Sequence, residues 1–159
     1  MNWIGALLVV SASYYCGVLV AENEKKRLAE VELIISLLSY MRRRMSVERM
    51  SLYRIFESYR AQNESEFLKI LTSNAGEASL LWKSAVPHLD IDADLKHELL
   101  IFGESLGKLP LDEQIKRLDS CTDVLIKGKD RLKSELPARQ KSRKTICLLF
   151  GLMTAIILL

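Results

Sequence analysis

The two ends of this 159-residue chain carry no charged side chain. All 23 Lys and Arg residues and all 20 Asp and Glu residues lie within residues 22–144, so residues 1–21 and 145–159 hold only apolar and uncharged polar side chains. The average of 49% hydrophobic and 27% charged residues therefore hides two kinds of segment. This division excludes a freely soluble enzyme, a secreted disulfide-stapled domain and a disordered polar tail. It predicts a membrane hairpin with a charged domain between its arms.

The first uncharged end is long enough to cross a bilayer. Residues 1–21 supply about the ~20 helical residues that span a hydrocarbon core of ~30 Å. Residues 145–159 cover only roughly 22 Å as a helix. They span if Arg143 and Lys144 reach back to the headgroups and the bilayer thins, or if the terminal carboxylate lies among the headgroups. Because no cation precedes Trp3 and no small-x-small site lies near Ala21, we expect an uncleaved anchor and not a signal peptide.

Cations flank both uncharged ends on the side of the charged domain. Lys and Arg close to a span stay on the cytoplasmic side of a membrane. The sequence therefore predicts a transmembrane anchor at 1–21, a cytoplasmic helical domain at 22–144 and a C-terminal transmembrane segment at 145–159, with both termini on the far side. The membrane-flanking cations are Lys25, Lys26, Arg27, Arg139, Lys141, Arg143 and Lys144.

The charged domain has the periodicity of helices. Apolar residues recur every three or four positions over residues 28–45, and no Gly or Pro interrupts residues 18–59. We therefore expect the first span to continue into the domain as one rod that ends near Met45. No segment alternates β-branched with polar residues. The sequence predicts an all-α fold, a bundle of about six helices flanked by an N-terminal and a C-terminal transmembrane helix.

Capping and helix-breaking residues predict the boundaries of these helices. Ser46 is predicted to be the N-cap of the second helix, and Asn63 with Glu66 to form a capping box for the third. Four further positions are predicted to end, start or kink a helix: Pro87 ends the fourth, Gly107 ends the fifth, Pro110 lies in the first turn of the sixth, and Pro137 kinks it.

No group of residues predicts catalysis, a metal site or a cofactor. Asp90, Asp92 and Asp94 imitate the start of a calcium loop, but Leu95 and Ile101 stand where that loop needs Gly and Glu. We interpret the aspartates as carboxylates at a helix N-terminus.

The histidines, cysteines and serines form no site either. His88 and His97 lack a third ligand, and the serines have no partnered His and acid. Cys16, Cys121 and Cys147 are interpreted as reduced, because their spacing fits neither a disulfide framework nor a zinc site. A net charge of +3 is too small to suggest a nucleic-acid partner. The chain is predicted not to be an enzyme.

Two features are candidates for packing or interaction. Gly103 and Gly107 are four residues apart, which predicts one helix face where a neighbouring backbone comes close. The basic cluster of Arg42, Arg43, Arg44 and Arg49 either contacts anionic lipid or an acidic partner, or forms a solvated helix end. Their position roughly 25 Å along the helix favours a protein over lipid as that partner.

The order of these features resembles a known family. An apolar anchor, the helix at residues 31–41, Trp82 after Glu77 and Ala78, and a terminal apolar segment are similar to stage III sporulation protein AB of endospore-forming bacteria. The most specific part runs from Gly103 to Gln114. Its candidate residues for interaction or packing are Gly103, Ser105, Leu106, Gly107 and Gln114.

The resemblance implies a platform subunit of the transenvelope channel that joins mother cell and forespore. Such a subunit would lie in the mother-cell membrane around the forespore and link the cytosolic sporulation ATPase, protein AA, to membrane lipids and other channel proteins of the same operon. Its soluble domain would be similar to inner-membrane platform proteins of type II secretion and type IV pili. A platform subunit of such a machine outside sporulation is the alternative, and the resemblance leaves the oligomeric state open.

Overall fold

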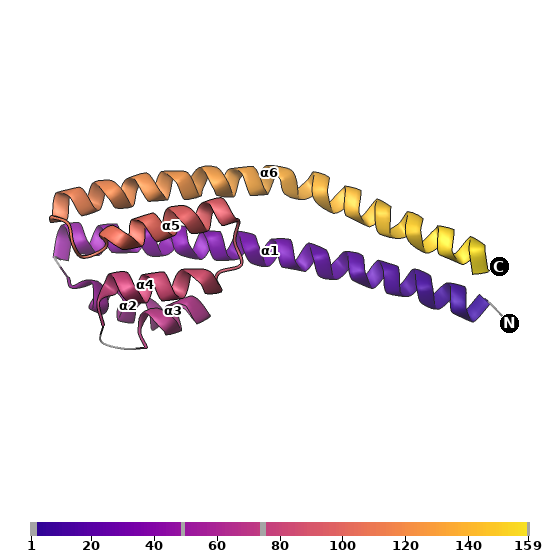
Figure 1. The fold of residues 1–159 in the computed structure, drawn as a ribbon, viewed down its shortest axis with the longest axis horizontal. Helices are drawn as coiled ribbons and strands as arrows, with labels where there is room; N and C mark the ends of the chain where they lie inside the picture. The colour runs from indigo at the N-terminus through magenta and orange to yellow at the C-terminus, as the bar shows by residue number, and fades with distance from the viewer. Residues whose placement is uncertain (1–2, 49, 74–75, 159) are drawn as a thin grey trace. The chain divides into compact units, whose positions relative to one another are not determined.

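The computed structural model describes residues 3–48, 50–73 and 76–158, and it leaves the side chains of most residues in the two uncharged ends undescribed. Over the described residues the chain is helical and has no strand, which confirms the all-α prediction (Figure 1). The elements are α1 (Trp3–Glu48), α2 (Leu52–Arg60), α3 (Glu66–Leu71), α4 (Ala78–Ala85), the short 3-10 helix η1 (Val86–His88), α5 (Ala93–Ser105) and α6 (Leu111–Leu158).

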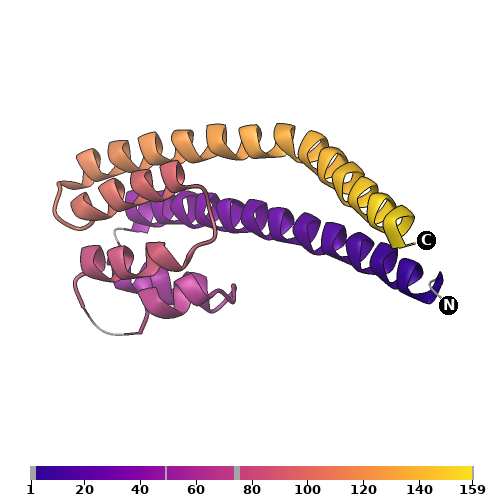
Figure 2. The same cartoon turned by 45° about the vertical axis from the view of Figure 1, so that its right-hand side comes forward.

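The chain divides into two units. The arm unit consists of Met1–Leu28 and Asp130–Leu159, and the bundle unit consists of Ala29–Lys129. Within the arm unit, the first part of α1 and the last part of α6 run in opposite directions in both views (Figures 1 and 2). The bundle unit contains the rest of these two helices together with α2 to α5.

Two long helices connect the units. The single helix α1 confirms the predicted continuous rod, and it ends at Glu48, close to the predicted Met45. Pro137 lies inside α6, where it removes one backbone N–H from the helical ladder without ending the helix. The flanking segments are thus continuations of domain helices and not separate elements.

Among the residues whose side chains are described, no helix is long and apolar enough to cross a membrane. The predicted spans at 1–21 and 145–159 fall largely on residues whose side chains lie outside that set. Both spans stay predictions.

The core of the bundle unit is built around an aromatic cluster. Trp82 of α4 is fully buried, and its ring centroid lies 6.2 Å from that of Phe56, 5.4 Å from Phe67 and 5.3 Å from Phe102. The Phe67 and Phe102 rings meet it edge to face, which is a favoured aromatic geometry. The predicted apolar stripe of α1 lines this core: its buried members are Val31, Ile34, Leu38, Met41 and Met45.

Ser46 is not the N-cap of the second helix. The helix α1 continues past it to Glu48, and the Ser46 hydroxyl donates to the Arg43 carbonyl at 3.2 Å. The N-cap of α2 is Ser51, whose carbonyl accepts from the Ile55 N–H at 3.1 Å. A serine can bond to a carbonyl of its own helix as readily as it can cap a new one, so its identity alone did not place the boundary.

The predicted capping box at Asn63 is also wrong. The Asn63 side-chain amide donates to the Tyr59 carbonyl at 3.2 Å, so it satisfies an acceptor at the end of α2. The helix α3 begins at Glu66 with Ser65 as its N-cap. An asparagine side chain can hydrogen-bond at the end of one helix or at the start of the next. In the short link between α2 and α3, Asn63 bonds at the end of α2.

The remaining boundaries lie close to their predicted positions. Pro87 lies in η1, directly after the end of α4 at Ala85, and Gly107 follows the end of α5 with φ of 79°. Pro110 was predicted in the first turn of the sixth helix, but α6 begins one residue later, at Leu111. The Pro110 carbonyl accepts from the Gln114 N–H at 2.9 Å, so Pro110 directly precedes the first turn.

Candidate interaction surface

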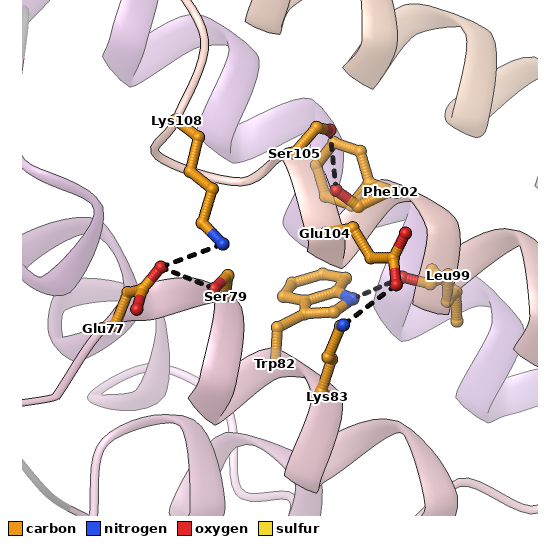
Figure 3. A network of polar contacts seen from close by, with 9 residues as sticks. All are labelled: Glu77, Ser79, Trp82, Lys83, Leu99, Phe102, Glu104, Ser105 and Lys108. Atoms are coloured by element: carbon orange, nitrogen blue, oxygen red, sulfur yellow. Dashed lines mark hydrogen bonds and ion pairs between the residues drawn. The ribbon is translucent and has the colours of Figure 1, made fainter.

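Gly103 is a packing position in the core. A Cβ atom on this residue would lie 2.4 Å from Cδ1 of Trp82, closer than real side-chain contacts allow. The Trp82 indole N–H donates to the Leu99 carbonyl at 2.8 Å, which orients the ring against α5 (Figure 3). A close approach does occur at Gly103, between α4 and α5 inside this chain, but the group that comes close is the Trp82 side chain and not the backbone of a neighbouring helix.

Two ion pairs join the same elements at the surface. Lys83 Nζ lies 2.9 Å from Glu104 Oε1, and Lys108 Nζ lies 3.2 Å from Glu77 Oε1 (Figure 3). The Ser79 hydroxyl also donates to Glu77 at 2.9 Å. The hydrogen bond from Ser79 lowers the pKa of the Glu77 carboxyl, and the nearby Lys108 ammonium lowers it further. All four charged side chains are largely exposed, so these pairs orient α4 against α5 more than they stabilise the fold.

Lys83 likewise lowers the pKa of the Glu104 carboxyl, mainly through their hydrogen bond.

Gly107 does not share a helix face with Gly103. The helix α5 ends at Ser105, and the positive φ of Gly107 places it in a turn. The Ser105 hydroxyl donates to the Phe102 carbonyl at 2.9 Å, and the Leu106 side chain is buried in the core. Of these four candidates, Gly103 and Leu106 are buried, Ser105 is half-buried and Gly107 is exposed in the turn after α5.

Gln114 is buried, with 5% of its surface exposed. It lies on the same face of α6 as the buried residues Leu118 and Cys121. Its Nε2 atom has no hydrogen-bond acceptor among the described residues. This candidate also faces inward.

The three arginines at the end of α1 have different surroundings. Arg42 Nε lies 2.6 Å from Asp119 Oδ1, which ties α1 to α6. Arg44 pairs with Glu48 within α1, and this hydrogen bond, with a smaller contribution from Tyr40, raises the pKa of Arg44. Arg43 packs its guanidinium 5.8 Å from the Tyr40 ring centroid and has no carboxylate partner among the described residues.

The membrane-flanking cations are only partly described. Lys25 and Lys26 are exposed, and Arg27 is half-buried. The side chains of the C-terminal group, namely Arg139, Lys141, Arg143 and Lys144, lie outside the described residues. Arg49, which follows the last residue of α1, lies outside them as well.

The described residues offer no cluster of three or more His, Cys, Asp or Glu side chains that could hold a metal ion. Cys121 is a buried free thiol, and burial together with Glu98 raises its pKa to about 12. A thiol with so high a pKa is a poor nucleophile and a poor metal ligand at neutral pH. The side chains of Cys16 and Cys147 lie outside the described set.

An open hollow of mixed polarity at the start of α6 was not predicted. It has a volume of about 450 Å³ and is lined by Met45, Met50, Leu111 and Asp112. The sequence held one signal for it: Met50 and Leu111 are apolar residues in or beside a link between helices. Residues distant in the sequence line it together, so periodicity within one helix could not reveal it.

The sequence was compared with models of known protein families. The family model described as stage III sporulation protein AB matches residues 2–159. The chain belongs to the stage III sporulation protein AB family. No curated protein and no solved structure matches it significantly.

In this member of the stage III sporulation protein AB family, several of the residues that carried the resemblance are core residues. The residues Trp82, Phe102, Gly103 and Leu106 are buried inside the bundle unit, and Gln114 is buried as well. The family pattern thus records the fold of the bundle unit. An interaction surface has to be sought among the exposed residues.

Proposed function

We propose that this chain is a non-enzymatic platform subunit of the channel that joins mother cell and forespore during endospore formation. The observation that carries the proposal is the family match along residues 2–159. A helical bundle built on two helices that extend into uncharged ends supports a scaffolding role.

The proposed place of the chain is the mother-cell membrane around the forespore, with residues 22–144 in the cytoplasm and both termini on the far side. The support is the position of the cations, which flank the uncharged ends on the side of the charged domain. From there the bundle unit would link the cytosolic sporulation ATPase to membrane components of the channel.

Affinity capture tests the proposed partner. The tagged full chain is cross-linked in membranes of sporulating cells and isolated, and the captured proteins are identified by mass spectrometry, with untagged cells as the control. We expect the sporulation ATPase among them. Capture of pilus or secretion subunits without that ATPase would instead favour a machine outside sporulation.

Cysteine labelling tests the proposed orientation. Gln62 is exposed in the link between α2 and α3, so Gln62→Cys offers a reporter thiol in a chain whose Cys16 and Cys147 are replaced by Ser. In a non-sporulating host, we expect a membrane-impermeant maleimide to label it only after permeabilisation. A cysteine added after Leu159 is the matched control, expected to be labelled in intact cells. Labelling of Gln62→Cys in intact cells contradicts the orientation.

A further inference from the structure

The end of α1 presents an apolar side chain to solvent beside a cation. Val47 is 75% exposed, the largest value among the described large hydrophobic residues. It lies four residues after the exposed Arg43, so the two side chains are neighbours on one face of the helix. We call this pair, Arg43 and Val47, the ridge. An exposed valine next to a cation with no described carboxylate partner is a surface suited to a partner with the complementary features.

The hollow at the start of α6 has those complementary features. Its lining is apolar at Met45, Met50 and Leu111, and its one charged residue is Asp112. Methionine side chains adapt to the shape of what they contact. The hollow of about 450 Å³ is much larger than a valine side chain, and Leu111 keeps 37% of its surface exposed.

A single copy cannot fill its own hollow with its own ridge. Met45 lines the hollow, and Val47 is two residues further along the same helix, about 200° around its axis at 3.6 residues per turn. The two surfaces therefore lie on opposite sides of α1. Each copy offers one donor surface and one acceptor surface that it cannot satisfy internally.

We infer that the ridge of one copy docks in the hollow of a second copy. Val47 would cover the apolar lining, and Arg43 would approach Asp112, so apolar area and charge are matched together. Because the ridge and the hollow are different surfaces, the contact is head-to-tail and leaves one of each free. Repetition gives a ring if the rotation closes and a filament if it does not.

Charge exchange tests the pairing in the purified full chain in detergent. The self-association constant is measured by sedimentation for Val47→Asp, Arg43→Glu, Asp112→Lys and the double variant Arg43→Glu with Asp112→Lys. We expect Val47→Asp to weaken association about tenfold, because an apolar side chain loses its buried site. Each single reversal weakens it too, and the double variant restores it, since every contact then holds both reversed charges.

Matched controls separate this contact from a general surface effect. Leu80→Asp changes another strongly exposed apolar residue, on α4, and Asp123→Lys reverses another exposed aspartate of α6; both should associate like the parent chain. Arg49→Gln should do so as well. Loss of association in Arg49→Gln would make Arg49 the partner of Asp112 and overturn the pairing with Arg43.

Disulfide trapping tests the head-to-tail geometry even if a charge variant folds poorly. In the chain lacking Cys16 and Cys147, Val47→Cys and Leu111→Cys are prepared separately and mixed under mild oxidation. We expect a cross-linked dimer in the mixture and little in either variant alone. Equal cross-linking of Val47→Cys with itself would indicate a symmetric contact and contradict the inference.

A parent chain that stays monomeric, or a double variant no better than the single ones, also overturns it. A protein other than this chain that is trapped by Leu111→Cys in cells, with no self-association, would assign the hollow to that protein. None of these results bears on capture of the ATPase, so the failure of this inference and of the proposed function are distinguishable.

Discussion

Trp82 and Gly103 depend on each other at the level of single residues. The indole ring occupies the space that any side chain at position 103 would need, and its N–H is held by the Leu99 carbonyl. Glycine therefore stands inside the last turn of α5 in spite of its low helix propensity. A small residue on one helix permits a large one on the next.

We expect Gly103→Ala to destabilise the chain by about 1–3 kcal/mol, because the added methyl group overlaps the Trp82 ring and outweighs the gain in helix propensity. Urea unfolding of the full chain in detergent, followed by circular dichroism, measures the change. Gly76→Ala is the matched control, since its Cβ would meet Leu81 at 3.8 Å, an ordinary contact. Equal stability of the two variants contradicts the packing described for Gly103.

Cys121 gives a prediction about pH. Burial raises the pKa of its thiol from 9.0 to about 12, so the folded state keeps the proton after an exposed thiol has lost it. Stability linked to this group is complete below about pH 9 and falls as the pH rises from 9 toward 12.

We expect Cys121 to react with thiol reagents at pH 8 only after unfolding, and Cys121→Ala to show a shallower loss of stability above pH 9 than the parent chain. Both measurements use chains that lack Cys16 and Cys147, so that Cys121 is the one thiol that can react or titrate. Rapid labelling of the folded chain would contradict the burial of Cys121.

At the scale of elements, the positions of the links between helices set the helix boundaries that residue type alone did not specify. Ser46 and Asn63 both had the chemistry of N-caps, and both bond instead to the helix that precedes them. A hydroxyl or amide satisfies whichever end is near, and that depends on where the chain turns. The turn after α5 was predictable for a different reason, because a backbone with positive φ selects glycine.

Gly107→Ala is expected to cost about 1–2 kcal/mol of unfolding free energy, since a side chain at φ of 79° meets the preceding backbone. Gly107→Asn should cost less, because asparagine tolerates this conformation better. Thermal or urea unfolding of the three chains gives the order Gly, Asn, Ala. Alanine as stable as glycine would show that the turn relaxes to another conformation.

At the scale of the whole chain, α1 and α6 are helices of 46 and 48 residues, and each contains residues of the bundle unit and of one uncharged end. The continuity of α1 followed from the sequence, because residues 18–59 contain no Gly or Pro to end the helix. The length of α6 did not follow in this way, because that helix continues through Gly128 and Pro137. The membrane role proposed for the ends rests on their lack of charge.

A charge in the first uncharged end tests that role. We expect the full chain to stay in the membrane pellet after alkaline carbonate extraction, and Leu8→Arg to shift a large part of it to the soluble or degraded fraction. An arginine near the middle of a span costs about 2.5–3.5 kcal/mol of insertion free energy. Asn23→Arg, just outside the segment, is the control. If Leu8→Arg leaves the fraction in the membrane pellet unchanged, residues 1–21 do not span the membrane.

The sequence by itself determined the helical class, the apolar stripe of α1 and the uncharged ends, because each depends on the spacing of residues along the chain. It also carried the family pattern, and Gly103 within it. Only the tertiary structure decided that Gly107 belongs to a turn, that Gln114 faces inward, and that Met45 and Leu111 meet in one hollow. Those outcomes depend on which helices lie against each other, and packing between distant segments is not encoded in any local period.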